Sequence, residues 1–186
     1  MDTADIAKAY LLYFILPLWI LAGIADWVCH RAARIELTAG PRESLIHLLM
    51  LGEAGTAIAA GLFFNITSLV LLIMLIAWAV HEVTAFGDIT YASAHRVIKP
   101  VEQWVHDYLG VIPLLALSFV VVIHWPSFLA IFGLGDQPPD WSLTFRQGFF
   151  SPLYLGPLLV AMAFNLILYL LELYRCIRAV PHLVRI

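Results

Sequence analysis

The sequence predicts an all-α, polytopic membrane protein with about five transmembrane helices. Hydrophobic residues make up 62% of its 186 residues and charged residues 12%, and the mean hydropathy of +0.91 lies far above soluble-domain values. Five apolar stretches are each long enough for the roughly 20 helical residues that cross a bilayer core of about 30 Å. We therefore expect a single integral membrane domain that covers residues 1-186.

Each expected span has a recognisable boundary. The first lacks the basic start of a secretion signal and carries Asp26 near its end, so we expect it to stay in the mature chain. Asn65 with Thr67 predicts a tight turn between the second and third spans. A segment rich in Gly, Pro and aromatic residues such as Phe149, 126-150, predicts an outer loop at the membrane interface. The spans are expected near 6-29, 44-64, 66-87, 103-125 and 151-174.

The basic residues predict the orientation of the chain. Lysine and arginine in short loops stay on the cytoplasmic side, so the N-terminus is expected outside and the C-terminus inside. Only Lys8 and Arg146 depart from this distribution. We expect the bacterial inner (cytoplasmic) membrane. The other eight basic residues fall between spans one and two, between three and four, or after five: Arg31, Arg34, Arg42, Arg96, Lys99, Arg175, Arg178 and Arg185.

One motif occurs at the start of two spans. It places an acid near the helix start and a histidine one turn deeper, on the same face and about 6 Å away along the axis. Proline and an acid alone are also typical of helix capping, but capping needs no histidine and does not explain a repeat. The pattern therefore favours a metal site. Its two copies are Pro41-x-Glu43-x-x-x-His47 and Pro100-x-Glu102-x-x-x-His106, each preceded by a His-Arg pair, His30-Arg31 or His95-Arg96.

Further ionisable residues fall at the same, cytoplasmic ends of the spans. Asp26 and His30 form a third acid-x-x-x-His pair. A seven-residue rhythm also runs from His81 to Glu102, although Gly87 and Pro100 argue against one unbroken helix there. The candidate metal ligands are His30, His47, His81, His95, His106, Asp26, Glu43, Asp88 and Glu102.

This set of ligand types and its size predict two metal ions. Imidazoles and carboxylates suit iron, zinc or manganese, and five histidines with four acids exceed the needs of one tetrahedral zinc. Soluble di-metal four-helix bundles use inward acids and histidines in two pseudo-symmetric halves. We therefore expect a four-helix bundle of two pseudo-repeated hairpins, spans one with two and three with four. The fifth helix would cover one flank.

The layout of apolar spans with a histidine and carboxylate cluster at their cytoplasmic ends resembles the integral-membrane di-iron desaturases, hydroxylases and monooxygenases, although their histidine boxes are absent. The resemblance implies an oxidoreductase that activates dioxygen on an apolar or lipid substrate. It implies two metal ions, iron in the first place, with the histidines as terminal ligands and Glu43 with Glu102 as bridges. An electron-donor protein is an implied partner, and no nucleic acid is expected.

Three more acids and four other functions stay open at the level of sequence. Glu53 is a candidate catalytic residue that either makes a buried hydrogen bond or lines a substrate path, Glu82 is expected to pair with Arg96 or Lys99, and Glu172 can approach from the fifth helix. The same ligand types also suit a zinc-dependent lipid hydrolase, a haem-binding electron carrier or a metal transporter. A structural membrane protein with mutually paired polar residues is the non-catalytic alternative.

Overall fold

The computed structural model describes residues 2–148 and 150–183, and these residues form helices and their connections without a strand. Phe149 of the predicted outer loop and Arg185 of the basic set lie outside them. Five helices are long and apolar enough to cross a membrane. The elements are α1 (Thr3–Tyr10), a π-helical turn (Leu11–Ile15), α2 (Leu16–Ala33), a 3-10 turn (Ile35–Leu37), α3 (Gly40–Phe63), α4 (Ser68–His95), α5 (Pro100–Ile123), α6 (Trp125–Ile131) and α7 (Pro152–Leu183).

Five helices coincide with the five predicted stretches. The first extends beyond its stretch at both ends, and the others extend beyond theirs at the end near the short links but stop one or two residues inside them at the opposite end. The first membrane-length helix is continuous from Thr3 to Ala33. Gly87 does not interrupt α4, contrary to the expectation from sequence, because a single glycine weakens a helix by only about 1 kcal/mol. Pro100 does act as a break: the backbone is extended at Lys99, and α5 begins at the proline.

Two short connections lie at one end of the helices. The link from α2 to α3 turns at Arg34, a residue in the left-handed conformation with φ 52°, and fully buries Ile35. Because the link is short, the C-terminal turn of α2 and the N-terminal turns of α3 lie at the same level. The link from α4 to α5, which carries Arg96, has the same effect for those two helices.

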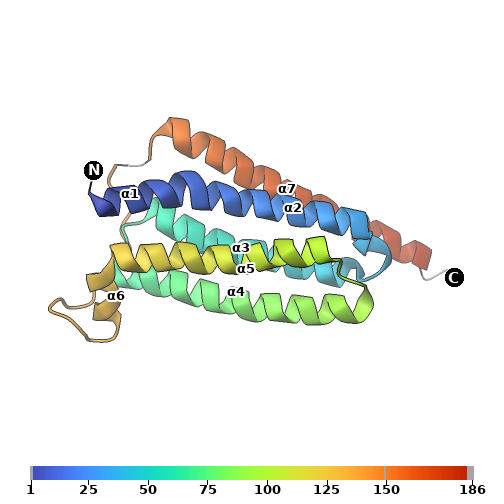
Figure 1. Ribbon diagram of the computed structural model, residues 1–186, viewed down its shortest axis with the longest axis horizontal. Coiled ribbons are helices and arrows are strands. Elements are labelled where there is room, and N and C mark those ends of the chain that lie inside the picture. The colour runs from blue at the N-terminus through green and yellow to red at the C-terminus, as the bar shows by residue number, and fades with distance from the viewer. Residues whose placement is uncertain (1, 149, 184–186) are drawn as a thin grey trace.

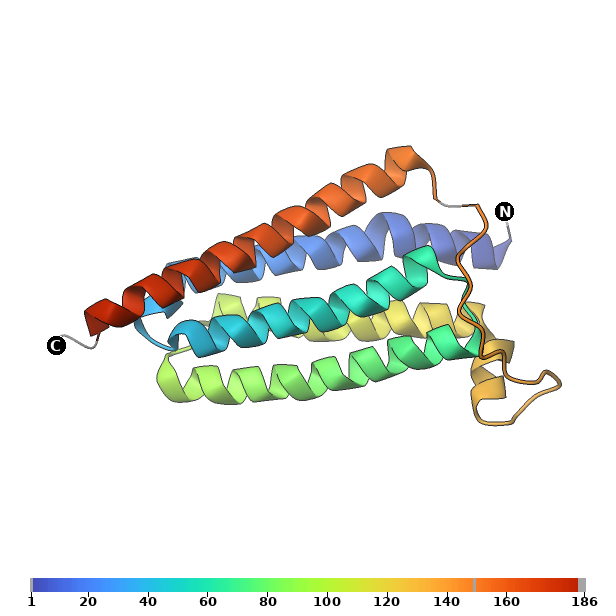
Figure 2. The ribbon, with the colours of Figure 1, turned by 180° about the vertical axis from the view of Figure 1, so that it is seen from behind.

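The membrane-length helices form a closed ring in the order α2, α5, α4, α3, α7 and back to α2. Figures 1 and 2 show the helices side by side along their length. This arrangement differs from the predicted bundle of two hairpins with a flanking fifth helix. The second of those hairpins, α4 with α5, is present, whereas α2 packs on α5 and α7 instead of pairing mainly with α3. Helix α7 is therefore a full member of the ring.

The opposite end is covered by α6 and the segment after it (Figure 2). The predicted turn at Asn65 and Thr67 joins α3 to α4, while the first part of the predicted loop is helical. The rest of that loop crosses the turn. The backbone N–H of Asn65 donates to the Thr144 carbonyl at 2.9 Å, and the Thr67 hydroxyl donates to the Ser142 carbonyl at 2.9 Å. Several aromatic side chains of this loop are exposed, including Phe145, and their position at a membrane interface stays a prediction.

Candidate metal centre

A cluster of buried ionisable side chains lies inside the helix ring, near the short α2–α3 and α4–α5 links. Every membrane-length helix contributes to it. Buried acids are costly in an apolar protein interior unless cations or hydrogen-bond donors accompany them. The contributors are Asp26 and His30 from α2, Glu43 and His47 from α3, Asp88 from α4, Glu102 and the partly buried His106 from α5, and Glu172 from α7.

Glu172 joins two histidines from different helices. Its carboxylate oxygens lie 3.1 Å from Nδ1 of His30 and 2.9 Å from Nδ1 of His47. A carboxylate only accepts hydrogen bonds, so each Nδ1 donates its proton, and whenever the imidazole is neutral its Nε2 presents a lone pair. The two rings stack with their centroids 4.2 Å apart and their planes 10° apart. Glu172 thus fixes both the orientation and the tautomer of this pair.

The Nε2 atoms of the same two histidines face the other acids in a quasi-symmetric pattern. Nε2 of His30 lies 3.3 Å from Asp26 and 3.8 Å from Glu102. Nε2 of His47 lies 3.3 Å from Asp88 and 3.8 Å from Glu43. Neither nitrogen has a hydrogen-bond partner of good geometry among the described residues, although both are buried. Two imidazole nitrogens and four carboxylates therefore converge without satisfying one another.

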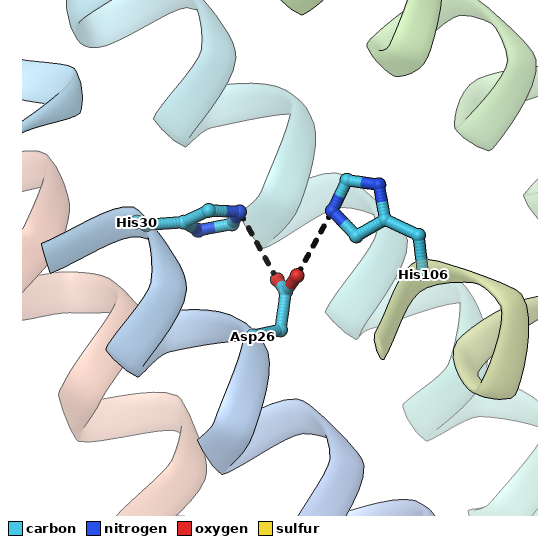
Figure 3. A group of neighbouring side chains, drawn as sticks. All are labelled: Asp26, His30 and His106. Carbon is cyan, nitrogen blue, oxygen red and sulfur yellow. Dashed lines mark ion pairs between the residues drawn. The ribbon is translucent and has the colours of Figure 1, made fainter. Parts of the chain in front are cut away.

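His106 extends the cluster on the α5 side. Its Nε2 lies 3.0 Å from one oxygen of Asp26, whose other oxygen faces His30 (Figure 3). Asp26, His30 and His106 can each direct a donor atom to one point, because those atoms lie within 4.8 Å of one another. His30, Glu43 and His47 form a second such group. The donor set of both groups, imidazole with carboxylate, is one that divalent transition metals accept.

Arg96 is the one guanidinium at the centre of the described cluster, and it joins the two glutamates of the repeated motif. It donates to Glu43 through Nε at 3.0 Å and Nη2 at 2.6 Å, and Nη2 also donates to Glu102. Burial by itself would lower the pKa of Arg96, but the hydrogen bonds to Glu102 and Glu43 raise it above its usual value, so the side chain stays cationic. Neither glutamate accepts a hydrogen bond from a backbone amide among the described residues, which does not favour the helix-capping alternative.

The charges of the cluster do not balance on their own. Five ionised carboxylates, set against the single positive charge of Arg96, leave a net charge of −4 when the histidines are neutral. Protonating His30, His47 and His106 would reduce this excess to −1. Two divalent cations would cancel it while leaving every imidazole neutral. The residues present therefore fit two metal ions by donor type and by charge.

Two predicted histidine ligands do not reach the cluster. His95 is exposed at the end of α4, where its Nδ1 contacts the Tyr91 carbonyl at 2.8 Å and its ring packs on that of Tyr91. His81 lies deeper on α4, 3.6 Å from Glu53. Seven helical residues advance about 10.5 Å, so only one of His81, Asp88 and His95 can lie at the level of the cluster. Asp88 is that residue.

The two other acids considered from sequence also lie apart from the cluster. Glu53 is partly buried, accepts a hydrogen bond from the Thr84 hydroxyl at 2.8 Å and lines a cavity. The expected hydrogen bond is present, and its role toward a substrate stays a prediction. Glu82 also lines a cavity. Among the described residues it forms no ion pair with Arg96 or Lys99, because Arg96 turns toward Glu43 and Glu102.

Tyr169 belongs to the site and was not predicted. Its hydroxyl lies 2.9 Å from Asp26 and 3.0 Å from the Gly23 carbonyl, and its ring meets the rings of His30 and His47 edge-on. It stands three residues before Glu172, hence on the same face of α7. The sequence signal for this face of α7 was Glu172, because an acid within an apolar span is rare in membrane helices.

A cavity of about 910 Å³ reaches the cluster from between the helices. Asp26, His47, Asp88, His106 and Tyr169 line its polar part, and the rest of its wall is mainly apolar. Its wall thus combines an apolar surface with the charged groups of the cluster.

Comparison with protein-family models, with characterised proteins and with solved structures finds no match for this chain.

Proposed function

We propose that the protein is a membrane-embedded di-metal oxidoreductase that acts on an apolar or lipid substrate. The observation that carries the proposal is the paired orientation of His30 and His47 by Glu172. A carboxylate behind a metal-binding imidazole sets the tautomer and makes the ring a better ligand. Here one carboxylate does this for two rings, and both free nitrogens point into a group of acids.

The ligands divide into two sets. Asp26, His30 and His106 would hold one ion, with Glu102 beside them, and Glu43, His47 and Asp88 would hold the other. A carboxylate has about four lone-pair positions, so Glu43 and Glu102 can keep Arg96 and still bind metal. Arg96 would then limit the excess negative charge near the ions. Iron is the metal we expect, with zinc and manganese as alternatives.

Metal and cavity together support oxidation chemistry. Bound iron would supply the activation of dioxygen, and this chain's residues would bind, orient and protect the reactants. The apolar cavity beside the cluster would hold a hydrocarbon substrate and keep bulk water away from the acids. Electrons would come from a donor protein.

The orientation and location belong to the same proposal. Seven described basic residues, from Arg31 to Arg178, lie in the links or helix end beside the cluster. By the positive-inside rule that end would face the cytoplasm of a bacterial inner membrane, with the N-terminus outside and the C-terminus inside. A cytoplasmic electron donor could then approach the metal centre.

Elemental analysis of the purified full-length chain tests the proposal. We expect two irons per chain and dioxygen consumption when a reductant is supplied. His47→Gln should lose metal and dioxygen consumption, whereas His95→Gln should retain both, because His95 is exposed and its ring contacts Tyr91, outside the cluster.

A different metal content would contradict this proposal and support another function. One zinc per chain would indicate a hydrolase, and a Soret band would indicate a haem protein. A folded chain without metal, from cells supplied with iron, zinc and manganese, would overturn it and leave a structural network of protonated histidines and acids.

A further inference from the structure

Two basic residues that depart from the charge distribution meet at one place. Lys8 on α1 and Arg146 in the segment before α7 are far apart in sequence, yet both line a second cavity, together with His124. We call Lys8, His124 and Arg146 the distal cation group, because it lies at the end of the helices opposite the metal centre.

Glu53, the acid that lines the same cavity as the distal cation group, contacts Thr84 and His81 instead. Among the described side chains, neither Lys8 nor Arg146 forms an ion pair. Burial lowers the pKa of His124, and the charges of Lys8 and Arg146 lower it further, which places all three groups within electrostatic reach. Lys8 is exposed and Arg146 is partly buried, and together they give this end of the cavity a positive potential that favours an anion.

Arg146 is held in position for such an anion. Its Nη2 donates to the Gly61 carbonyl at 3.0 Å, and its guanidinium lies over the Phe150 ring, 5.0 Å from the ring centroid. Its Nε is buried and has no hydrogen-bond partner among the described residues. A guanidinium with a fixed plane and an unused N–H is suited to a carboxylate.

The second cavity extends from this group along largely apolar walls and adjoins the cavity that reaches the cluster; we call the two cavities together the apolar passage. Apart from Glu53 and His81, the wall of the second cavity beyond the cations is almost wholly apolar and includes Trp19 and Trp78. It shares Trp19, Ala54, Ile58 and His81 with the cavity that reaches the cluster, so the two adjoin.

The length of the passage fits one hydrocarbon chain. Along α3, Glu53 lies about 12 Å and His47 about 21 Å from Gly61, at 1.5 Å per residue. A lipid chain that fills one leaflet reaches about half of a 30 Å bilayer core, roughly 15 Å. A chain anchored at the distal cation group therefore passes Glu53 and extends toward His47.

We propose that the two adjoining cavities bind a long-chain fatty carboxylate, with its head at the distal cation group and its chain directed at the metal centre. As the substrate site of the enzyme this rests on the proposed function. As a binding site it does not require the metal.

Binding of 16-carbon chains to metal-free protein in phosphatidylcholine nanodiscs tests the proposal. Brominated hexadecanoate should quench fluorescence from Trp19 and Trp78, and its methyl ester should bind far more weakly. Lys8→Met with Arg146→Met should weaken carboxylate binding by tenfold or more, since charge-assisted hydrogen bonds are lost. Lys99→Met with Arg178→Met removes two exposed charges at the other end and should change nothing.

A second readout locates the head group. The carboxylate should raise the pKa of His124 in an NMR titration, because it offsets the effect of Lys8 and Arg146. Equal binding of acid and ester, or no response of His124, would overturn the proposal. Stronger quenching by brominated phosphatidylglycerol, dependent on Lys8 and Arg146, would overturn it in favour of a phospholipid. Metal content is measured in a separate experiment, so the fatty-carboxylate binding result can be interpreted even if the protein holds no metal.

Discussion

At the scale of single residues, Glu172 decides how two histidines present their nitrogens. Its two oxygens each accept from a different Nδ1, and the Nε2 atoms of His30 and His47 consequently point away from α7 into the acids. The side chain is fully buried. Water cannot replace it easily, so its role is sensitive to small chemical changes.

Glu172→Gln should show whether Glu172 orients the two histidine rings or only fills space between the helices. Glutamine has nearly the same shape, but its amide nitrogen donates, so it can accept from one Nδ1 only. The other histidine must then change tautomer and place a proton on its ligand nitrogen. We expect metal affinity to fall about 10- to 100-fold, measured by competition with a chelator.

Glu82→Gln is the matched control, because Glu82 lies on the cavity wall without a partner in the cluster. It should keep the metal affinity of the unaltered protein. Unchanged affinity in Glu172→Gln as well would show that Glu172 does not orient the ligands.

Sequence spacing predicted part of this cluster and missed part of it. The four-residue spacing correctly brings Asp26 to His30 and Glu43 near His47, because such pairs share one helical face. Residues seven apart on α4 lie on the same face of the helix but at different heights along its axis. Only Asp88 therefore lies at the height of the cluster, and His81 and His95 lie away from it. Contacts between helices, such as that of Glu172 with both histidines, have no local signature.

At the scale of elements, α7 completes the ring through a close approach to α2. A Cβ added to Gly23 would lie 2.6 Å from Nδ2 of Asn165, which is buried on α7. Tyr169, one turn further along α7, reaches the Gly23 carbonyl and Asp26. Gly23 therefore leaves room for the Asn165 side chain where the two helices meet next to the cluster.

Gly23→Ala should weaken this contact. Alanine normally stabilises a helix by about 0.5–1 kcal/mol relative to glycine, but overpacking costs about 1–3 kcal/mol. We expect a lower midpoint of thermal unfolding in detergent and faster loss of metal. Gly156→Ala on exposed α7 surface, with open space at its Cβ, should raise the midpoint. Equal increases in both variants would show that α2 and α7 are not tightly packed at Gly23.

The helices themselves were predictable because membrane length and apolar composition are local properties. Which helices pack against one another was not predictable from the sequence. Side chains that face lipid are as apolar as those between helices, so composition does not state which helix packs on which. The order of the ring depends on small residues such as Gly23 and on polar contacts across it, such as those of Arg96 and Tyr169.

At the scale of the whole molecule, the two ends differ in charge and in covering. One end carries the candidate metal centre and most of the described basic residues. The other end carries α6 and the crossing segment (Figure 1), together with the distal cation group. Lys8 and Arg146 weaken the charge bias from which orientation is predicted, and the ligand role proposed for them at the second cavity would account for their position. The remaining bias favours a cytoplasmic metal centre.

Labelling of introduced cysteines in intact bacteria tests this orientation. Leu37 and Leu134 are both exposed and lie in connections at opposite ends of the helices. In a background with Cys29→Ala and Cys176→Ala, Leu134→Cys should react with a membrane-impermeant maleimide, and Leu37→Cys only after permeabilisation. Labelling of both after permeabilisation controls for reactivity. The reverse pattern in intact cells would place the metal centre outside, where a cytoplasmic electron donor could not reach it, and would redirect the search for the reductant to that side.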